Sequence, residues 1–127
     1  MNIISTKQAP AAIGPYVQAI STGSMVFTSG QLPVDPETGL MSEAIEVQAY
    51  QSLENVRAII EASGLAVKDI VKTTVFVKDL NDFAAVNAVY EAFFTKHAGA
   101  FPARSCVEVA RLPKDAKIEI EALAVLS

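Results

Sequence analysis

The chain has 127 residues, the usual length of one domain, so we predict a single domain over residues 1–127. Apolar residues make up 51% of the chain and charged residues only 19%, which excludes the composition of a disordered protein. The 10 basic and 14 acidic residues give a net charge of −4 without a basic block, which disfavours general nucleic-acid binding.

The first third of the chain predicts short strands separated by turns. Residues 3–4 could form a short edge strand, and the runs 16–20 and 25–29 predict a hairpin. Pro15 restricts the backbone before it, so Tyr16 enters the hairpin from a fixed direction. Residues 31–42 carry two prolines and the turn DPETG, which predict an ordered loop or a short hairpin.

The middle of the chain predicts a helix followed by a strand. From Ser42 to Ser63 apolar residues recur three or four positions apart, as on one face of an amphipathic helix. Ser42 is a plausible N-cap, and Gly64 is well placed to end the helix. Residues 70–78, IVKTTVFVK, are rich in β-branched side chains and predict a strand.

A second amphipathic helix is predicted over residues 81–97. Its aromatic and aliphatic side chains recur at helical spacing, with Asn81 or Asp79 near the cap and Gly99 just past the end. The chain therefore alternates helix and strand before its last two elements.

Two alternating runs end the chain. In the first run, residues 104–109, Arg104 and Cys106 point one way; the second run covers residues 117–125. We expect these two strands to be adjacent and to share one apolar face toward the core. The other face would then carry Arg104, Cys106 and Glu119, which are groups suited to small-molecule chemistry.

This order of elements predicts an α+β fold. Two helices can cover one face of one mixed sheet, giving two layers. The other sheet face is too apolar to lie in water and too charged for an ordinary core. A subunit interface containing a cleft would satisfy both requirements.

The composition also bears on compartment and metal binding. No apolar run is long enough to cross a bilayer, and MNIISTKQAP lacks the features of a signal peptide. The one cysteine, Cys106, cannot form an intrachain disulfide, and with a single histidine it cannot build a typical zinc site. We therefore predict a cytoplasmic protein without a membrane association or a metal.

The charged candidates each have two interpretations. Arg104 is an ordinary surface arginine, or one half of a structural ion pair with Glu119 or Glu121, or a planar fork that binds a substrate carboxylate. Glu119 is either the outward residue of an amphipathic strand or a general acid/base.

The uncharged candidates are equally open. Cys106 is a nucleophile only with a base nearby, and His97 stands at a helix end, so a lining thiol is favoured. Ser29 and Gly30, in FTSGQLP, fit no known nucleophile or phosphate motif and predict a strand end and a turn. Asn87 is either a solvent residue or a polar anchor. Tyr16 belongs either to the core or to the rim of a site.

Five segments of the chain resemble the RidA (reactive intermediate deaminase A, YjgF) family. They are APAAIGPYVQA at 9–19, FTSGQLPV at 27–34, QSLENV at 51–56, DIVKTTVFVKDLNDFAAVNA at 69–88 and PARSCVEVARLPKDAKIEIE at 102–121. The resemblance implies a chorismate-mutase-like subunit that forms a homotrimer, with three clefts at the subunit interfaces and no cofactor.

The resemblance also implies an activity. Family members hydrolyse 2-imino acids such as 2-iminobutanoate and 2-iminopropanoate, or their enamine tautomers such as 2-aminoacrylate, to 2-oxo acids and ammonia. Pyridoxal-phosphate (PLP)-dependent threonine and serine dehydratases release these imines, which damage PLP enzymes. Arg104 falls at the family's carboxylate-binding position and Glu119 at its water-positioning one. The implied substrate-binding residues are Tyr16, Ser29, Gly30, Asn87, Arg104 and Cys106.

Other functions stay open on the sequence. The same pocket could hold a 2-oxo acid as a signal in a regulatory trimer without turnover, and relatives also suggest a chaperone-like holdase or a ribonuclease. A ribonuclease fits poorly with the charge of −4. Strand geometry indicates that Arg104 and Glu119 of one cleft come from the same chain.

Overall fold

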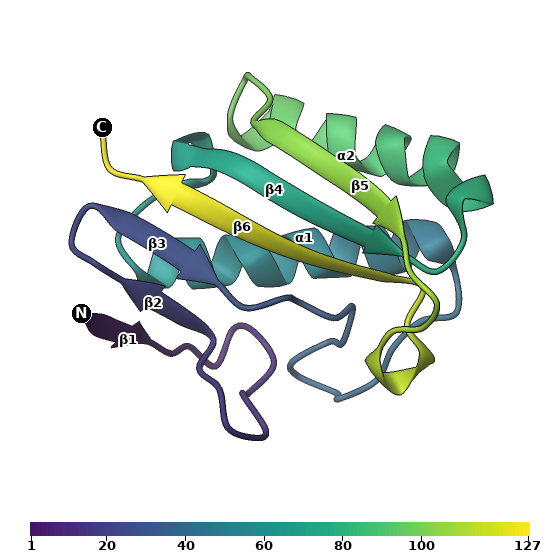
Figure 1. The fold of residues 1–127 in the computed structure, drawn as a ribbon, viewed down its shortest axis with the longest axis horizontal. Coiled ribbons are helices and arrows are strands. Elements are labelled where there is room, and N and C mark those ends of the chain that lie inside the picture. Colours follow the sequence, from purple (N-terminus) through teal and green to yellow (C-terminus); the bar gives the residue numbers. More distant parts are fainter.

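The computed structural model describes all 127 residues, Met1–Ser127, as a sheet layer and a helix layer (Figure 1). The strands are β1 (Asn2–Ile4), β2 (Ala19–Ser21), β3 (Met25–Thr28), β4 (Ile70–Val77), β5 (Ala103–Glu108) and β6 (Ile118–Val125). The helices are α1 (Ile45–Ala62) and α2 (Phe83–His97), with short 3-10 turns η1 (Val67–Asp69), η2 (Leu80–Asp82) and η3 (Pro113–Asp115). The predicted α+β class is confirmed.

The strands form one mixed sheet in the order β1-β2-β3-β6-β4-β5. Only β4 and β5 run parallel, and α2 supplies the crossover that a parallel pair requires. The prediction that the last two strands are adjacent is therefore wrong. The β-branched strand β4 pairs along its length with both of them and leaves β5 at the edge of the sheet.

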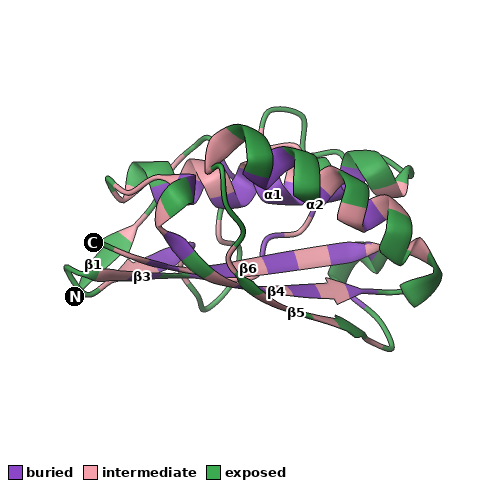
Figure 2. Cartoon of the chain, turned by 90° about the horizontal axis from the view of Figure 1, so that it is seen from above, coloured by how far each residue is buried: buried purple, intermediate pink, exposed green.

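Both helices cover the same face of the sheet, as Figure 2 shows. Side chains of α1 and α2 that recur at helical spacing pack on alternate residues of the central strands, which are buried. The fully buried members from β4 and β6 include Val75, Val77, Ile118 and Ile120. Neither helix is long and apolar enough to cross a membrane.

The opposite face of the sheet is uncovered and partly apolar. Phe27 on β3 is 45% exposed and Val107 on β5 is 43% exposed, while Leu123 and Val125 on β6 are half-buried. Figure 2 shows this side of the sheet without a helix. The predicted open face therefore exists, and it carries apolar side chains beside Glu119.

Two element ends differ from the predictions. The helix α1 begins at Ile45 rather than after Ser42, because the Ser42 hydroxyl accepts a hydrogen bond from the Ala44 N–H (3.2 Å) in the preceding turn. Gly64 ends α1 as predicted, with φ of +93°. The strand β2 begins only at Ala19, so Tyr16 lies in the loop before the hairpin.

Candidate functional site

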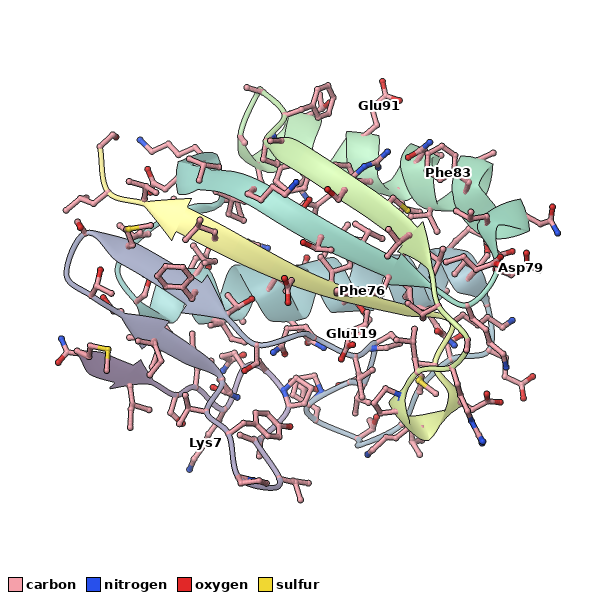
Figure 3. The ribbon with its side chains drawn as sticks, in the orientation of Figure 1. Lys7, Phe76, Asp79, Phe83, Glu91 and Glu119 are labelled. Atoms are coloured by element: carbon pink, nitrogen blue, oxygen red, sulfur yellow. The ribbon has the colours of Figure 1, made fainter.

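A cleft of about 780 Å³ opens around the carboxylate of Glu119. Four residues that the sequence singled out line it: Tyr16, Ser29, Gly30 and Glu119. The loop before β2, the loop after β3, η3 and the strand β6 bring them together, and we call this group the Glu119 cleft. Figure 3 shows Glu119 on β6 beside Phe76, its partner on β4.

Burial governs the electrostatics of the cleft. The pKa of Glu119 is raised, first because burial disfavours the charged carboxylate and second because Glu121 adds a like charge. Glu119 takes part in none of the three salt bridges of the chain. Its carboxylate is therefore tuned toward taking up and releasing a proton nearer to neutral pH.

Gly30 leaves room for that carboxylate. A Cβ atom on Gly30 would lie 2.8 Å from Cδ and 2.9 Å from Oε2 of Glu119, closer than real side chains approach. The Gly30 N–H has no backbone acceptor in the protomer, so it is a free donor next to Glu119. Glycine at this position thus serves a close approach and not only a turn.

Ser29 is tied to the backbone of the hairpin entry. Its hydroxyl donates to the Val17 carbonyl (2.6 Å), and its N–H donates to the Gln18 carbonyl (2.8 Å). The hydroxyl proton is committed, so Ser29 can face a ligand only as an acceptor. The structure thus gives Ser29 no activating base.

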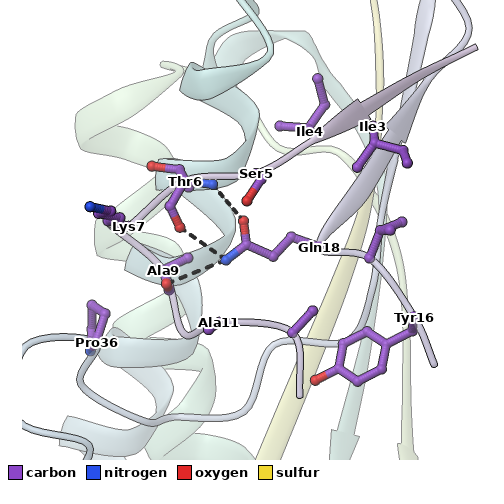
Figure 4. Close-up of a pocket in the computed structure, with 12 residues that line it drawn as sticks. Ile3, Ile4, Ser5, Thr6, Lys7, Ala9, Ala11, Tyr16, Gln18 and Pro36 are labelled. Atoms are coloured by element: carbon purple, nitrogen blue, oxygen red, sulfur yellow. Dashed lines mark hydrogen bonds between the residues drawn. The ribbon is translucent and has the colours of Figure 1, made fainter. Parts of the chain in front are cut away.

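Gln18 holds the loop that carries Tyr16, and the sequence interpretation missed it. Its buried amide accepts from the Thr6 N–H (2.7 Å) and donates to the carbonyls of Pro10 (2.8 Å) and Thr6 (3.0 Å), as Figure 4 shows for part of this network. A second pocket of about 680 Å³ lies along the same loop. A polar residue inside the apolar run YVQAI was the available signal.

Arg104 lies at the edge strand β5, against α2. Its Nη1 donates to the Asn87 Oδ1 at 2.7 Å, and its Cζ lies 4.8 Å from the ring centre of Tyr90 and 5.4 Å from that of Phe83. Asn87 is therefore a polar anchor and not a solvent residue. We call Asn87, Arg104 and Cys106 the Arg104 corner.

No carboxylate of the same chain neutralises Arg104. The three salt bridges of the chain involve Arg57 and Lys78 as cations, so the interpretation of Arg104 as a partner of Glu119 or Glu121 is wrong. A guanidinium has five N–H donors, and only one is used within the protomer. The free donors can take a planar anion through two parallel hydrogen bonds.

Cys106 follows Arg104 on the same side of β5. Burial raises the pKa of its thiol, and the charge of Arg104 opposes that effect only in part. The ring centre of His97 lies 4.7 Å from that of Phe93, and the pKa of His97 is lowered by burial and by the charge of Arg57. The thiol is thus held protonated at neutral pH, which supports a lining role over a nucleophilic one.

The Arg104 corner and the Glu119 cleft lie on opposite faces of the sheet. On β4, Thr73 and Val75 are buried under the helices, whereas Phe76 points to the open face. Thr73 pairs with Arg104, and Phe76 pairs with Glu119. Because directly paired residues share a face, Arg104 faces the helices and Glu119 faces away from them.

The prediction that Arg104, Cys106 and Glu119 share the open face of the sheet is therefore wrong, and within one chain Arg104 and Glu119 do not meet. Arg104 does not line the Glu119 cleft, and neither do Asn87 and Cys106. Alternation within each strand was predicted correctly. Which side chains of β5 and β6 lie on the same face of the sheet depends on the register that each strand has with β4. The structure also brings together no group of three or more His, Cys, Asp or Glu side chains that could hold a metal.

The chain matches known proteins over nearly its whole length. The family model described as Endoribonuclease L-PSP matches residues 6–126. A protein of Salmonella typhimurium named 2-iminobutanoate/2-iminopropanoate deaminase is 75% identical over 122 residues, which are 96% of this chain and 95% of that protein.

Two solved structures from Escherichia coli are closely similar. TdcF with bound serine has a TM-score of 0.98 and 61% identity, and the match covers 100% of both chains. The YjgF gene product has a TM-score of 0.97 and 68% identity over 98% of each chain. The fold and the sequence thus lead to the same group of proteins.

Proposed function

The chain belongs to the RidA/YjgF family, which the Endoribonuclease L-PSP model describes, and from that premise we propose that it is a 2-imino acid deaminase. It hydrolyses 2-iminobutanoate, 2-iminopropanoate and their enamine tautomers to 2-oxo acids and ammonia. The observation that carries this proposal is the Arg104 guanidinium, which is held firmly and yet paired with no carboxylate. An imino acid supplies the missing carboxylate.

The residue chemistry accounts for each step. Arg104 holds the substrate carboxylate, and this fixes the C=N carbon relative to the attacking water. Glu119 accepts a proton from the water as the water oxygen bonds to that carbon, and it passes this proton to the imine nitrogen. The resulting carbinolamine then collapses: Glu119 moves the hydroxyl proton to the nitrogen, the C–N bond breaks, ammonia leaves and the C=O bond of the 2-oxo acid forms. A positioned acid/base group contributes about 10²–10⁴-fold to such a reaction.

We propose that the Arg104 corner of one copy meets the Glu119 cleft of another in a homotrimer. Two observations support this arrangement. The two groups lie on opposite faces of one protomer, and the open face carries partly exposed apolar residues such as Phe27 and Val107. An apolar face of this kind is covered favourably by a second copy. Each cleft would then take Arg104 and Glu119 from different chains.

The substrate class also points to a metabolic setting. Imines and enamines decay in water without help, so a useful catalyst must act where they are released. We propose that PLP-dependent threonine or serine dehydratases supply them in the cytoplasm, and that hydrolysis protects PLP enzymes from attack.

The test is a coupled trapping experiment. A threonine dehydratase generates the imine, semicarbazide traps it, and the trapping rate is followed as this protein is added. We expect the wild-type protein to suppress trapping and the Arg104→Ala variant not to do so. Binding of 2-oxobutanoate without any change in trapping would identify a sensor instead. Suppression of aggregation that survives Arg104→Ala would indicate a holdase, and cleavage of RNA by the purified protein a ribonuclease.

A further inference from the structure

We propose that Phe83 and Tyr90 are positioning residues that hold the Arg104 guanidinium ready for a ligand carboxylate. This inference rests on the proposed role of Arg104 and extends it to two residues of α2 that contact the arginine. Phe83, Asn87 and Tyr90 are spaced four and three residues apart on α2, so they form one stripe along the helix. All three contact Arg104.

The two aromatic contacts differ in how they are fixed. Tyr90 is only 6% exposed, and its hydroxyl shares a 2.7 Å hydrogen bond with the hydroxyl of Thr73. Thr73 is the strand partner of Arg104 on β4, so this bond ties the ring to the strand next to the arginine. Phe94 packs against the same ring at 4.7 Å between centres. The Tyr90 ring is therefore a rigid surface beneath the guanidinium.

Phe83 forms the outer contact. It is the first residue of α2 and is 38% exposed, so its ring lies at the surface, where Figure 3 places it at the start of the helix. Its ring centre lies 5.4 Å from the Arg104 Cζ, within the range of a cation–π contact. Replacing Phe83 consequently changes the arginine's surroundings without opening a hole in the core.

The choice of aromatic and amide partners matters for binding. A carboxylate partner would also hold Arg104, but it would compete with the carboxylate of the ligand for the same donors. Aromatic faces attract the cation and leave its N–H donors free, and Asn87 occupies only Nη1. The stripe thus restricts the rotamers of Arg104 before the ligand arrives. Ligand binding then does not have to include the entropy cost of ordering this side chain.

The test measures the affinity for 2-oxobutanoate by calorimetric titration of the full-length protein. Phe83→Leu should bind about twofold to tenfold more weakly than wild type, since loosening one long side chain has this effect. Tyr90→Leu should weaken binding at least as much, and Tyr90→Phe, which keeps the ring but loses the hydrogen bond to Thr73, should bind more weakly than wild type and more tightly than Tyr90→Leu. In turnover, KM should rise in Phe83→Leu while kcat changes by less than about twofold.

Two further variants separate positioning from a general structural effect. Phe83→Tyr keeps an aromatic face and should bind 2-oxobutanoate as wild type does. Tyr50→Leu replaces another exposed aromatic residue, on α1 and hydrogen-bonded to Glu54, and should leave both affinity and KM unchanged.

The inference is overturned if Phe83→Leu binds 2-oxobutanoate as tightly as wild type, if Phe83→Tyr is as weak as Phe83→Leu, or if the wild type does not bind 2-oxobutanoate. The titration involves no turnover. Absence of imine hydrolysis would therefore defeat the deaminase proposal without deciding this one.

Discussion

The Arg104 corner and the Glu119 cleft each keep one charge unpaired, but by different physical means. In the corner, a helix holds the cation with one amide and two aromatic rings, none of which carries a charge. In the cleft, mainly loops surround the carboxylate, and burial makes its charge unfavourable. The sheet between them prevents the two charges from neutralising each other within one protomer. Separation by a sheet therefore keeps both groups available for a ligand.

The largest expected effect comes from dividing the two groups between chains. Arg104→Ala and Glu119→Gln should each lower kcat/KM by about 10²–10⁴-fold, because each removes a group that contacts the reacting molecule. If the clefts of a homotrimer take these groups from different copies, refolding the two variants together at equal amounts should restore about one quarter of wild-type activity. At each interface one copy has an intact Arg104 in half of the cases, and the other copy has an intact Glu119 in half of the cases. About one quarter of the clefts therefore contain both groups.

Each variant refolded alone is the control for this experiment and should stay inactive. Mixed samples that remain as inactive as the separate variants would show that one chain supplies both groups. The position of Arg104 and Glu119 on opposite faces would then have no role in forming the cleft.

A smaller effect should follow from filling the space beside Glu119. Gly30→Ala places a methyl group where the carboxylate lies, so the flexible end of Glu119 must move. We expect kcat to fall by about 10–100-fold, since misplacement of a catalytic group by about 1 Å has this effect. Steady-state kinetics with enzymatically generated imine would measure it, and the melting temperature should change little.

Gly99→Ala provides the matched control. Gly99 follows α2 with φ of +71° and has open space around it, so alanine there is strained but meets no neighbour. It should lower the free energy of unfolding by about 1 kcal/mol and leave kcat unchanged. Equal losses of activity in the two variants would mean that the contact between Gly30 and Glu119 has no catalytic importance.

The smallest expected effect is on stability and depends on pH. The folded-state pKa of Glu119 is raised, so the folded chain binds this proton more tightly than the unfolded chain does. Stability from this group is present below the unfolded-state pKa of about 4.3 and is lost as pH rises through the folded-state value. Glu119→Gln should therefore melt slightly higher than wild type at pH 7, with the difference vanishing at pH 3.

Thermal melts of the two proteins across this pH range would decide the matter. A Glu119→Gln variant that melts lower at pH 7 would contradict the prediction and show that Arg104 of a neighbouring copy pairs with Glu119 in the assembled protein.

Much of the fold follows from local patterns. The period of the apolar residues predicted both helices, and the β-branched run predicted β4, because these signals depend on neighbours along the chain. The order of the strands did not follow. The strands β5 and β6 follow one another along the chain, which favours pairing them, and only the complete sheet shows that β4 pairs with both.

The resemblance proposes the members of the candidate site, but the sequence does not show on which face of the sheet each of them lies. The resemblance named Arg104 and Glu119 together, and alternation placed each on one face of its own strand. Whether Arg104 and Glu119 lie on the same face depends on their pairing with Thr73 and Phe76 of β4. The residue pattern within β5 or β6 alone does not contain that information. Tyr90 was missed as a partner of Arg104, because an aromatic residue at helical spacing is typical of a core.

The opposite facing of Arg104 and Glu119 also bears on how activity should respond to dilution. If a complete cleft exists only between copies, an isolated chain is inactive however well it folds, and activity per chain falls once the concentration drops below that needed for assembly. Synthesis of more protein would then raise activity more steeply than in proportion. The supply of the protein itself would act as the switch, without any separate effector.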